Sequence, residues 1–172
     1  MRRIWRNICA AVAIGAALSS GTSASACAIY TPPQIAIIGQ ADLAFVGTVT
    51  DIRVIGWEGN FGGIPLPYAL ITFSAVETLK GESQPEWKIL RWVNILGSST
   101  RLDPEKTVIV AAFDGTDKMR VLREAGADGG LVAEASAYIL QEPACSSAPI
   151  FENSAENRAA IELILAQTLD GQ

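Results

Sequence analysis

Long segments of alternating strand-forming residues constrain the fold of this chain more than any other feature. The segment 41–57, ADLAFVGTVTDIRVIGW, is rich in Val, Ile, Thr and Phe, and its apolar side chains recur at roughly every second position. This period is typical of a strand, because successive side chains of a strand point to opposite faces. Segments of the same kind follow at 68–81, 86–95 and 107–113. We therefore expect four strands at these places.

Two shorter apolar segments follow the fourth predicted strand. MRVLREA at 119–125 and LVAEASAYIL at 131–140 are interpreted as a fifth and a sixth strand, separated by the glycine-rich turn GADGG. Two stretches between the strands are predicted loops. EGNFGGIPLP at 58–67 combines glycines with prolines, and 97–106 contains the turn signal Asp103-Pro104.

Only the C-terminal segment changes to the period of a helix. Asn153 and Glu156 have the spacing of a capping pair at its start. One helical stripe is formed by Ile161, Ile164, Leu165 and Leu169. Five or six antiparallel strands followed by one helix predict a mainly β fold. We expect a five- to six-stranded closed OB-type (Greek-key) barrel with a C-terminal α-helix, because closure removes exposed strand edges.

The first 26 residues are interpreted as a signal peptide. Arg2, Arg3 and Arg6 precede the short apolar stretch ICAAVAIGAAL, and the small residues Ala24-Ser25-Ala26 stand where a signal peptidase would cut. Cleavage near Ala26 would leave 27–172 as a single domain that is periplasmic or secreted. A retained membrane anchor and a lipid anchor at Cys27 are the alternative uses of the same stretch.

The charge of the predicted mature chain excludes some classes of partner. Residues 1–26 contain three of the 13 basic residues and none of the 18 acidic ones, so 10 basic and 18 acidic residues remain, a net charge of −8. Nucleic acids and anionic membrane surfaces are bound through a basic footprint, which this chain lacks. The mature chain is also expected to contain no transmembrane segment.

Two cysteines remain after the predicted cleavage, because Cys9 lies in the leader. In an oxidising compartment Cys27 and Cys145 are expected to form a disulfide. Closing so long a loop would stabilise the fold by about 3–5 kcal/mol. The alternatives are two free thiols, or a lipidated Cys27 with Cys145 left alone.

Catalytic chemistry has little support in the sequence. The chain contains no histidine, which excludes Ser-His-Asp and Cys-His catalysis and histidine metal sites. Asp114 and Asp117 could contribute to a calcium site but fit an ordinary turn better, and Glu82 and Glu86 fit a solvated pair better than an acid–base dyad. We therefore expect no enzyme activity, no cofactor and no intrinsic metal site.

The order of several motifs resembles that of a known family. CAIYTPP at 27–33 leads into ADLAFVGTV, a later strand ends in VETLKG, and KTVIVAAF precedes the C-terminal CSSAPIFENSAENRAAIELIL. This order resembles netrin-like modules and the inhibitory domain of the tissue inhibitors of metalloproteinases, with their bacterial secreted relatives. The resemblance covers nearly all of 27–169 and implies a five-stranded OB-type barrel with flanking helices. The second cysteine of that family's Cys-x-Cys start is replaced here by Ile29.

The resemblance also implies a contact edge for a protein partner. In the inhibitors, the residue that matches Cys27 chelates the zinc of the target protease through its α-amine and carbonyl oxygen, and an N-terminal segment and a hairpin loop form the contact edge. Here that edge would contain Cys27 and Ala28 together with Trp57, Phe61 and Leu66 of the 57–67 loop. The aromatic residues could instead cap the open end of the barrel. An exported protein-binding module is the leading hypothesis, with a zinc metalloprotease as its sharper form, and an envelope-attached structural lipoprotein acylated at Cys27 is the alternative.

Overall fold

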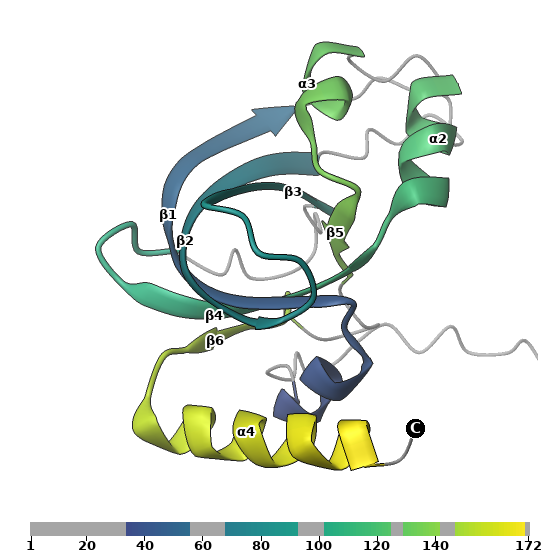
Figure 1. Ribbon diagram of the computed structural model, residues 1–172. Coiled ribbons are helices and arrows are strands. Elements are labelled where there is room, and N and C mark those ends of the chain that lie inside the picture. Colours follow the sequence, from purple (N-terminus) through teal and green to yellow (C-terminus); the bar gives the residue numbers. More distant parts are fainter. Residues whose placement is uncertain (1–33, 56–67, 93–101, 125–128, 142–146, 171–172) are drawn as a thin grey trace, which may run out of the picture.

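The computed structural model describes residues 34–55, 68–92, 102–124, 129–141 and 147–170 (Figure 1). In chain order its elements are the 3-10 helix η1 (Ile35–Gln40), β1 (Leu43–Ile55), β2 (Tyr68–Lys80), β3 (Glu86–Trp92), β4 (Thr107–Asp114), α2 (Thr116–Glu124), α3 (Gly129–Glu134), β5 (Tyr138–Leu140), β6 (Ile150–Glu152) and α4 (Ala155–Asp170). The predicted boundary between signal peptide and domain, at 26–27, lies outside these residues.

Five strands close into a barrel. The strands follow one another as β1-β2-β3-β5-β4, and β4 pairs back with β1. The β3–β5 pair is parallel and the other pairs are antiparallel. The sixth strand, β6, pairs with β4 outside the barrel. The structure therefore confirms a closed OB-type barrel followed by a C-terminal helix, with one parallel pair that the sequence did not predict.

The interior of the barrel is filled by aromatic and aliphatic side chains. Phe45 of β1 contacts Phe73 of β2 edge to face and stacks on Trp87 of β3, with ring centroids 5.5 and 6.2 Å apart. Aliphatic residues from all five strands surround these rings, among them Leu43, Ile71, Ile89, Val110 and Leu140. The alternation seen in the sequence thus places one face of each strand inside the barrel.

The outer face of β1 and β4 is covered by α4 and η1. Ala44 and Val46 of β1 and Ile109 and Ala111 of β4 point away from the barrel interior and pack against Ile38, Phe151, Ile161 and Leu165. In Figure 1, α4 lies below β4 and β6, with η1 against its C-terminal half. This contact explains why β1 and β4 are buried on both faces.

A second outer face, formed by β2, β3 and β5, is covered by α2 and α3. Met119 and Leu122 of α2 and Val132 of α3 pack onto the outward-facing residues Tyr68, Leu70, Leu90 and Ile139. Figure 1 shows these two short helices on the side of the barrel away from α4. The barrel is therefore enclosed between two unequal helical covers.

The fifth and sixth predicted strands are corrected by the structure. Of MRVLREA, residues 119–124 belong to α2: Met119 and Leu122, three residues apart, are buried, and Val121 between them is exposed. LVAEASAYIL is divided: its first part ends α3 at Glu134, and only Tyr138–Leu140 forms a strand. Both segments are too short for their apolar period to distinguish a helix from a strand.

The start of α4 also differs in detail from the prediction. Ser154, rather than Asn153, is the N-cap: its Oγ accepts a hydrogen bond from the backbone N–H of Asn157 at 3.2 Å. The predicted apolar stripe is confirmed for Ile161, which is buried, and for Ile164 and Leu165, which are half-buried. The side chain of Leu169 lies outside the described residues. Within the described ranges, the helices are all too short or too polar to cross a bilayer.

Candidate functional site

The contact edge predicted from the sequence lies outside the described residues. Cys27 and Ala28 fall within 1–33, Trp57, Phe61 and Leu66 fall within 56–67, and Cys145 falls within 142–146. The structure therefore neither joins nor separates these residues, and the Cys27–Cys145 disulfide stays a prediction. What it does place are the strand ends next to 56–67 and 142–146, whereas 1–33 leads into η1.

Those strand ends lie at one end of the barrel, which we call the barrel mouth. Ile55 at the end of β1 pairs with Tyr68 at the start of β2, and Tyr68 pairs in turn with Trp92 at the end of β3. Beside them, Arg91 of β3 pairs with Leu140, the last residue of β5. The 56–67 loop and the segment carrying Cys145 therefore both leave from the barrel mouth.

The barrel mouth carries an exposed apolar lip on β1. Ile52 and Val54 pair with Ile71 and Ala69, so they lie on the interior side of the sheet. Pairing of β1 with β4 ends at Thr48, however, and beyond that point Ile52 and Val54 are 44% and 67% exposed. The lip is therefore an exposed apolar surface on the part of β1 that leads into the 56–67 segment.

A groove of about 590 Å³ lies between β6 and the turn that precedes β4. Three half-buried aliphatic residues that also pack on the barrel interior, Leu102, Val108 and Ile150, line it together with Phe151 and Pro104. Its polar lining consists of Asp103, Lys106, Thr107 and Glu152. The volume falls in the range of ligand-binding pockets, about 300–1,000 Å³.

The face that OB-type barrels commonly use for ligands is occupied in this protein. Such barrels bind oligonucleotides and oligosaccharides on strands 2 and 3, between the loops that follow strands 1 and 4. Here the connection after β4 contains α2 and α3, and Leu122 and Val132 cover Leu70 and Leu90 on that face. A ligand could reach these residues only if the two helices moved.

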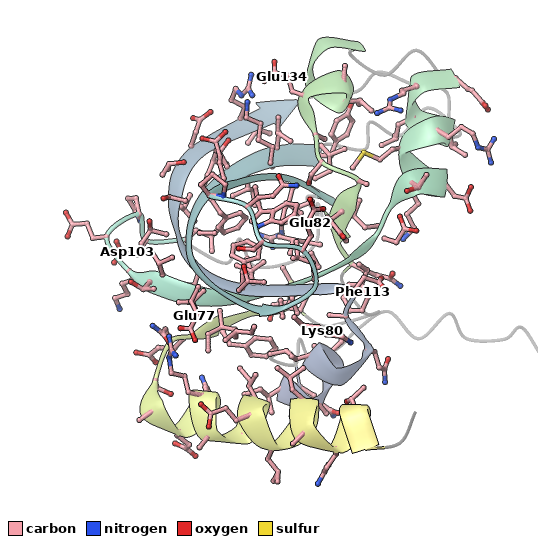
Figure 2. The ribbon with its side chains drawn as sticks, viewed as in Figure 1. Glu77, Lys80, Glu82, Asp103, Phe113 and Glu134 are labelled. Atoms are coloured by element: carbon pink, nitrogen blue, oxygen red, sulfur yellow. The ribbon has the colours of Figure 1, made fainter. Side chains whose placement is uncertain are left out.

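A cluster of charged side chains fastens the end of α3 to the sheet. Glu134, labelled in Figure 2, accepts hydrogen bonds from Nη2 and Nη1 of Arg53 at 2.6 and 3.4 Å, and its Oε2 lies 3.8 Å from Nζ of Lys88. Arg53 Nε also lies 3.3 Å from a carboxylate oxygen of Asp51. The hydrogen bond from Arg53 lowers the pKa of Glu134 and raises the pKa of Arg53 itself. Since all of these groups are solvent-accessible, the cluster positions α3 more than it stabilises the fold.

The carboxylates considered as catalytic or calcium-binding groups have ordinary surroundings. Asp114 Oδ1 accepts hydrogen bonds from the hydroxyl and the backbone N–H of Thr116, which lower the pKa of Asp114 and begin α2. Asp117 lies 3.5 Å from Arg120, one turn further along α2. Glu82 and Glu86 are exposed. Within the part of the chain that the structure describes, no group of three or more acidic or cysteine residues could hold a metal ion.

The sequence predicted neither the charged cluster around Glu134 nor the groove beside β6, because each joins residues that are distant in the chain. The cluster around Glu134 brings β1 and α3 together across 81 positions. The groove depends on β6, which is three residues long and gave no periodic signal in the sequence.

A search of protein-family models and a search of curated proteins found no match to this chain.

Proposed function

We propose that this chain is an exported protein-binding module of the netrin-like kind and acts by binding rather than by catalysis. The observation that carries the proposal is the coverage of the strand 2–3 face by α2 and α3. With that face occupied, the barrel mouth, where β1 ends and β2 begins, is the surface that we propose for binding. The net negative charge supports a polypeptide partner over a nucleic acid.

The contact edge in this proposal consists of the mature N-terminus, Cys27 and Ala28, and the loop residues Trp57, Phe61 and Leu66. Aromatic side chains on a loop that a rigid barrel supports are common anchors in protein interfaces. The exposed lip of Ile52 and Val54 supports this arrangement, because it provides apolar surface at the base of the loop.

Two substitutions test whether the loop is a contact surface or a cap. Trp57→Ala and Phe61→Ala should change the free energy of unfolding by less than about 0.5 kcal/mol if these rings face a partner. A loss of about 3 kcal/mol or more in each, measured by urea unfolding, would show that they cap the barrel mouth and would remove the loop from the contact edge.

The sharper form of the proposal is inhibition of a zinc metalloprotease through Cys27. An α-amine and a carbonyl oxygen on one residue could occupy the coordination position that a catalytic zinc leaves open for water. Protein that begins at Cys27 should inhibit members of a zinc-protease panel, and protein with one alanine added before Cys27 should not. Equal activity of the two proteins, or no inhibition by either, would contradict this form alone.

The alternative is an envelope-attached structural lipoprotein, in which Cys27, directly after the predicted cleavage site, would be the acylated residue. The intact mass of the protein purified from its envelope or culture medium separates the two functions. A chain that begins at Cys27 without added lipid supports the exported module. Acyl mass on Cys27 supports the lipoprotein and excludes the disulfide, because the sulfur of Cys27 then carries the lipid.

A further inference from the structure

We propose that the groove beside β6 takes up an extended segment of a partner polypeptide, which adds to β6 as a parallel strand and carries an apolar residue followed, two positions later, by lysine or arginine. This proposal rests on the proposed function only in taking the partner to be a protein. It concerns a different surface from the N-terminus and the 57–67 loop.

The outer edge of β6 provides the backbone groups for such an addition. Ile109 pairs with Phe151, and Ala111 donates to the carbonyl of Pro149 at 3.0 Å, so in antiparallel alternation the backbone groups of Phe151 face β4. The backbone groups of Ile150 and Glu152 consequently face outward. β6 is the last strand of the sheet that the described residues form.

Two of these outward groups already have partners, which restricts the direction of the added strand. The carbonyl of Glu152 accepts from Asn157 Nδ2 at 2.8 Å and from the backbone N–H of Ser154 at 2.9 Å, and the N–H of Ile150 donates to Ala148 at 2.7 Å. The carbonyl of Ile150 and the N–H of Glu152 remain directed outward. In a parallel pair, a single residue of the added strand can bond both groups. Its N–H donates to the carbonyl of Ile150, and its carbonyl accepts from the N–H of Glu152.

The side chains that flank this residue would face the groove. Phe151 points toward α4, so the residue of the added strand opposite it points the same way, and its two neighbours point to the groove side. In a parallel strand the preceding neighbour lies beside Ile150 and the following one beside Glu152. The first therefore meets the aliphatic lining of Leu102, Val108 and Ile150.

The charge around the groove selects the second side chain. Two carboxylates, those of Asp103 and Glu152, line the groove together with one ammonium group, that of Lys106. Figure 2 shows Asp103 at the projecting turn ahead of β4. A lysine or arginine beside Glu152 fits this charge, whereas a carboxylate there would be repelled. Strand addition with pockets for alternate side chains is a recurrent mode of peptide recognition.

Three blocked pentapeptides test the proposal against the ¹⁵N-labelled intact protein by NMR titration. Ac-Thr-Val-Thr-Lys-Thr-NH2 has the proposed order, Ac-Thr-Lys-Thr-Val-Thr-NH2 has the same composition in reverse, and Ac-Thr-Val-Thr-Glu-Thr-NH2 reverses the charge. The first should shift the backbone amides of Ile150, Glu152 and Val108. The dissociation constants of the other two should be at least about fivefold higher.

A charge reversal in the protein tests whether Glu152 selects the basic side chain of the peptide. Glu152→Lys should exchange the preference between the lysine and glutamate peptides, whereas Glu156→Lys, an exposed charge reversal in the first turn of α4 that does not line the groove, should leave it unchanged. Equal affinity for all three peptides, or no shift at these amides with any of them, would overturn the proposal. Either result would leave the Cys27 and 57–67 contact edge untouched, since that edge has its own tests.

Discussion

The two helical covers of the barrel differ in how they are attached. On the β1–β4 face, η1 and α4 bury a continuous apolar layer that includes Ile38, Phe151 and Ile161, and α4 also contacts η1. On the β2–β3–β5 face, α2 and α3 contribute the buried side chains of Met119, Leu122 and Val132, and the ion pairs of Glu134 supply part of the attachment. The first cover is therefore held mainly by apolar contacts, whereas the second combines apolar contacts with ion pairs and lies over a face that OB-type barrels use for ligands.

A pair of matched truncations tests this difference with the largest expected effect. Ile161→Ala removes a side chain that is 1% exposed and should lower the free energy of unfolding by about 3–4 kcal/mol. Leu122→Ala, at 8% exposure and beside a small cavity, should lower it by about 2 kcal/mol. Urea unfolding measures both values. An equal or larger loss for Leu122→Ala would contradict this difference between the two covers.

Two glycines, one at each helical cover, sharpen the comparison. A Cβ on Gly115, between β4 and α2, would collide with the side chain of Ile139, so Gly115→Ala should cost about 1–3 kcal/mol. A Cβ on Gly39 in η1 would lie 3.1 Å from Cγ2 of Ile164, and Gly39→Ala should cost less than about 1 kcal/mol. Thermal unfolding of the two variants, compared with the native protein, checks the order. A reversed order would show that η1 packs against α4 more rigidly than α2 packs against β5.

The start of α4 offers a smaller effect on the same side as Ile161. Ser154→Ala removes the N-cap hydrogen bond to Asn157 and should cost about 1 kcal/mol. Asn153→Ala removes only the partner of Arg158 Nε and should cost about half as much. Urea midpoints of the two variants check the assignment of the cap. A larger loss for Asn153→Ala would restore the capping pair predicted from the sequence.

The smallest effect concerns pH and the α2–α3 cover. Bonding to Arg53 lowers the pKa of Glu134 from its ordinary 4.5, and bonding to Thr116 lowers that of Asp114 from 3.8. Both carboxylates stabilise the folded state when ionised, so their contribution is complete above about pH 4.5 and is lost as the pH falls through the lowered values. Urea midpoints should therefore decrease on acidification. The decrease should be shallower in Glu134→Gln than in Glu162→Gln, an exposed control on α4, and identical curves would contradict a role for the cluster.

The strands could be read from the sequence because their signal is local. Residues 43–55 and 68–80 are long enough for alternation and β-branched residues to identify them, and β4 was found in the same way. The helices α2 and α3 were missed because each is short, and the burial of Met119, Leu122 and Val132 depends on a sheet face formed by other segments. The groove was missed because β6 is recognisable only by its pairing with β4.

The sequence by itself determined that the chain forms a small barrel with a C-terminal helix, because alternation and helical period are properties of consecutive residues. It also set the absence of histidine, which excludes catalysis and metal sites that depend on a histidine of this chain, and the negative net charge, which disfavours binding to nucleic acid. Only the tertiary structure decided that α2 and α3 cover the β2–β3–β5 face and that β6 forms the last strand of the described sheet. Those properties arise where Leu70 meets Leu122 and where β6 meets β4, and the free energy of such contacts depends on chain closure, which no local pattern encodes.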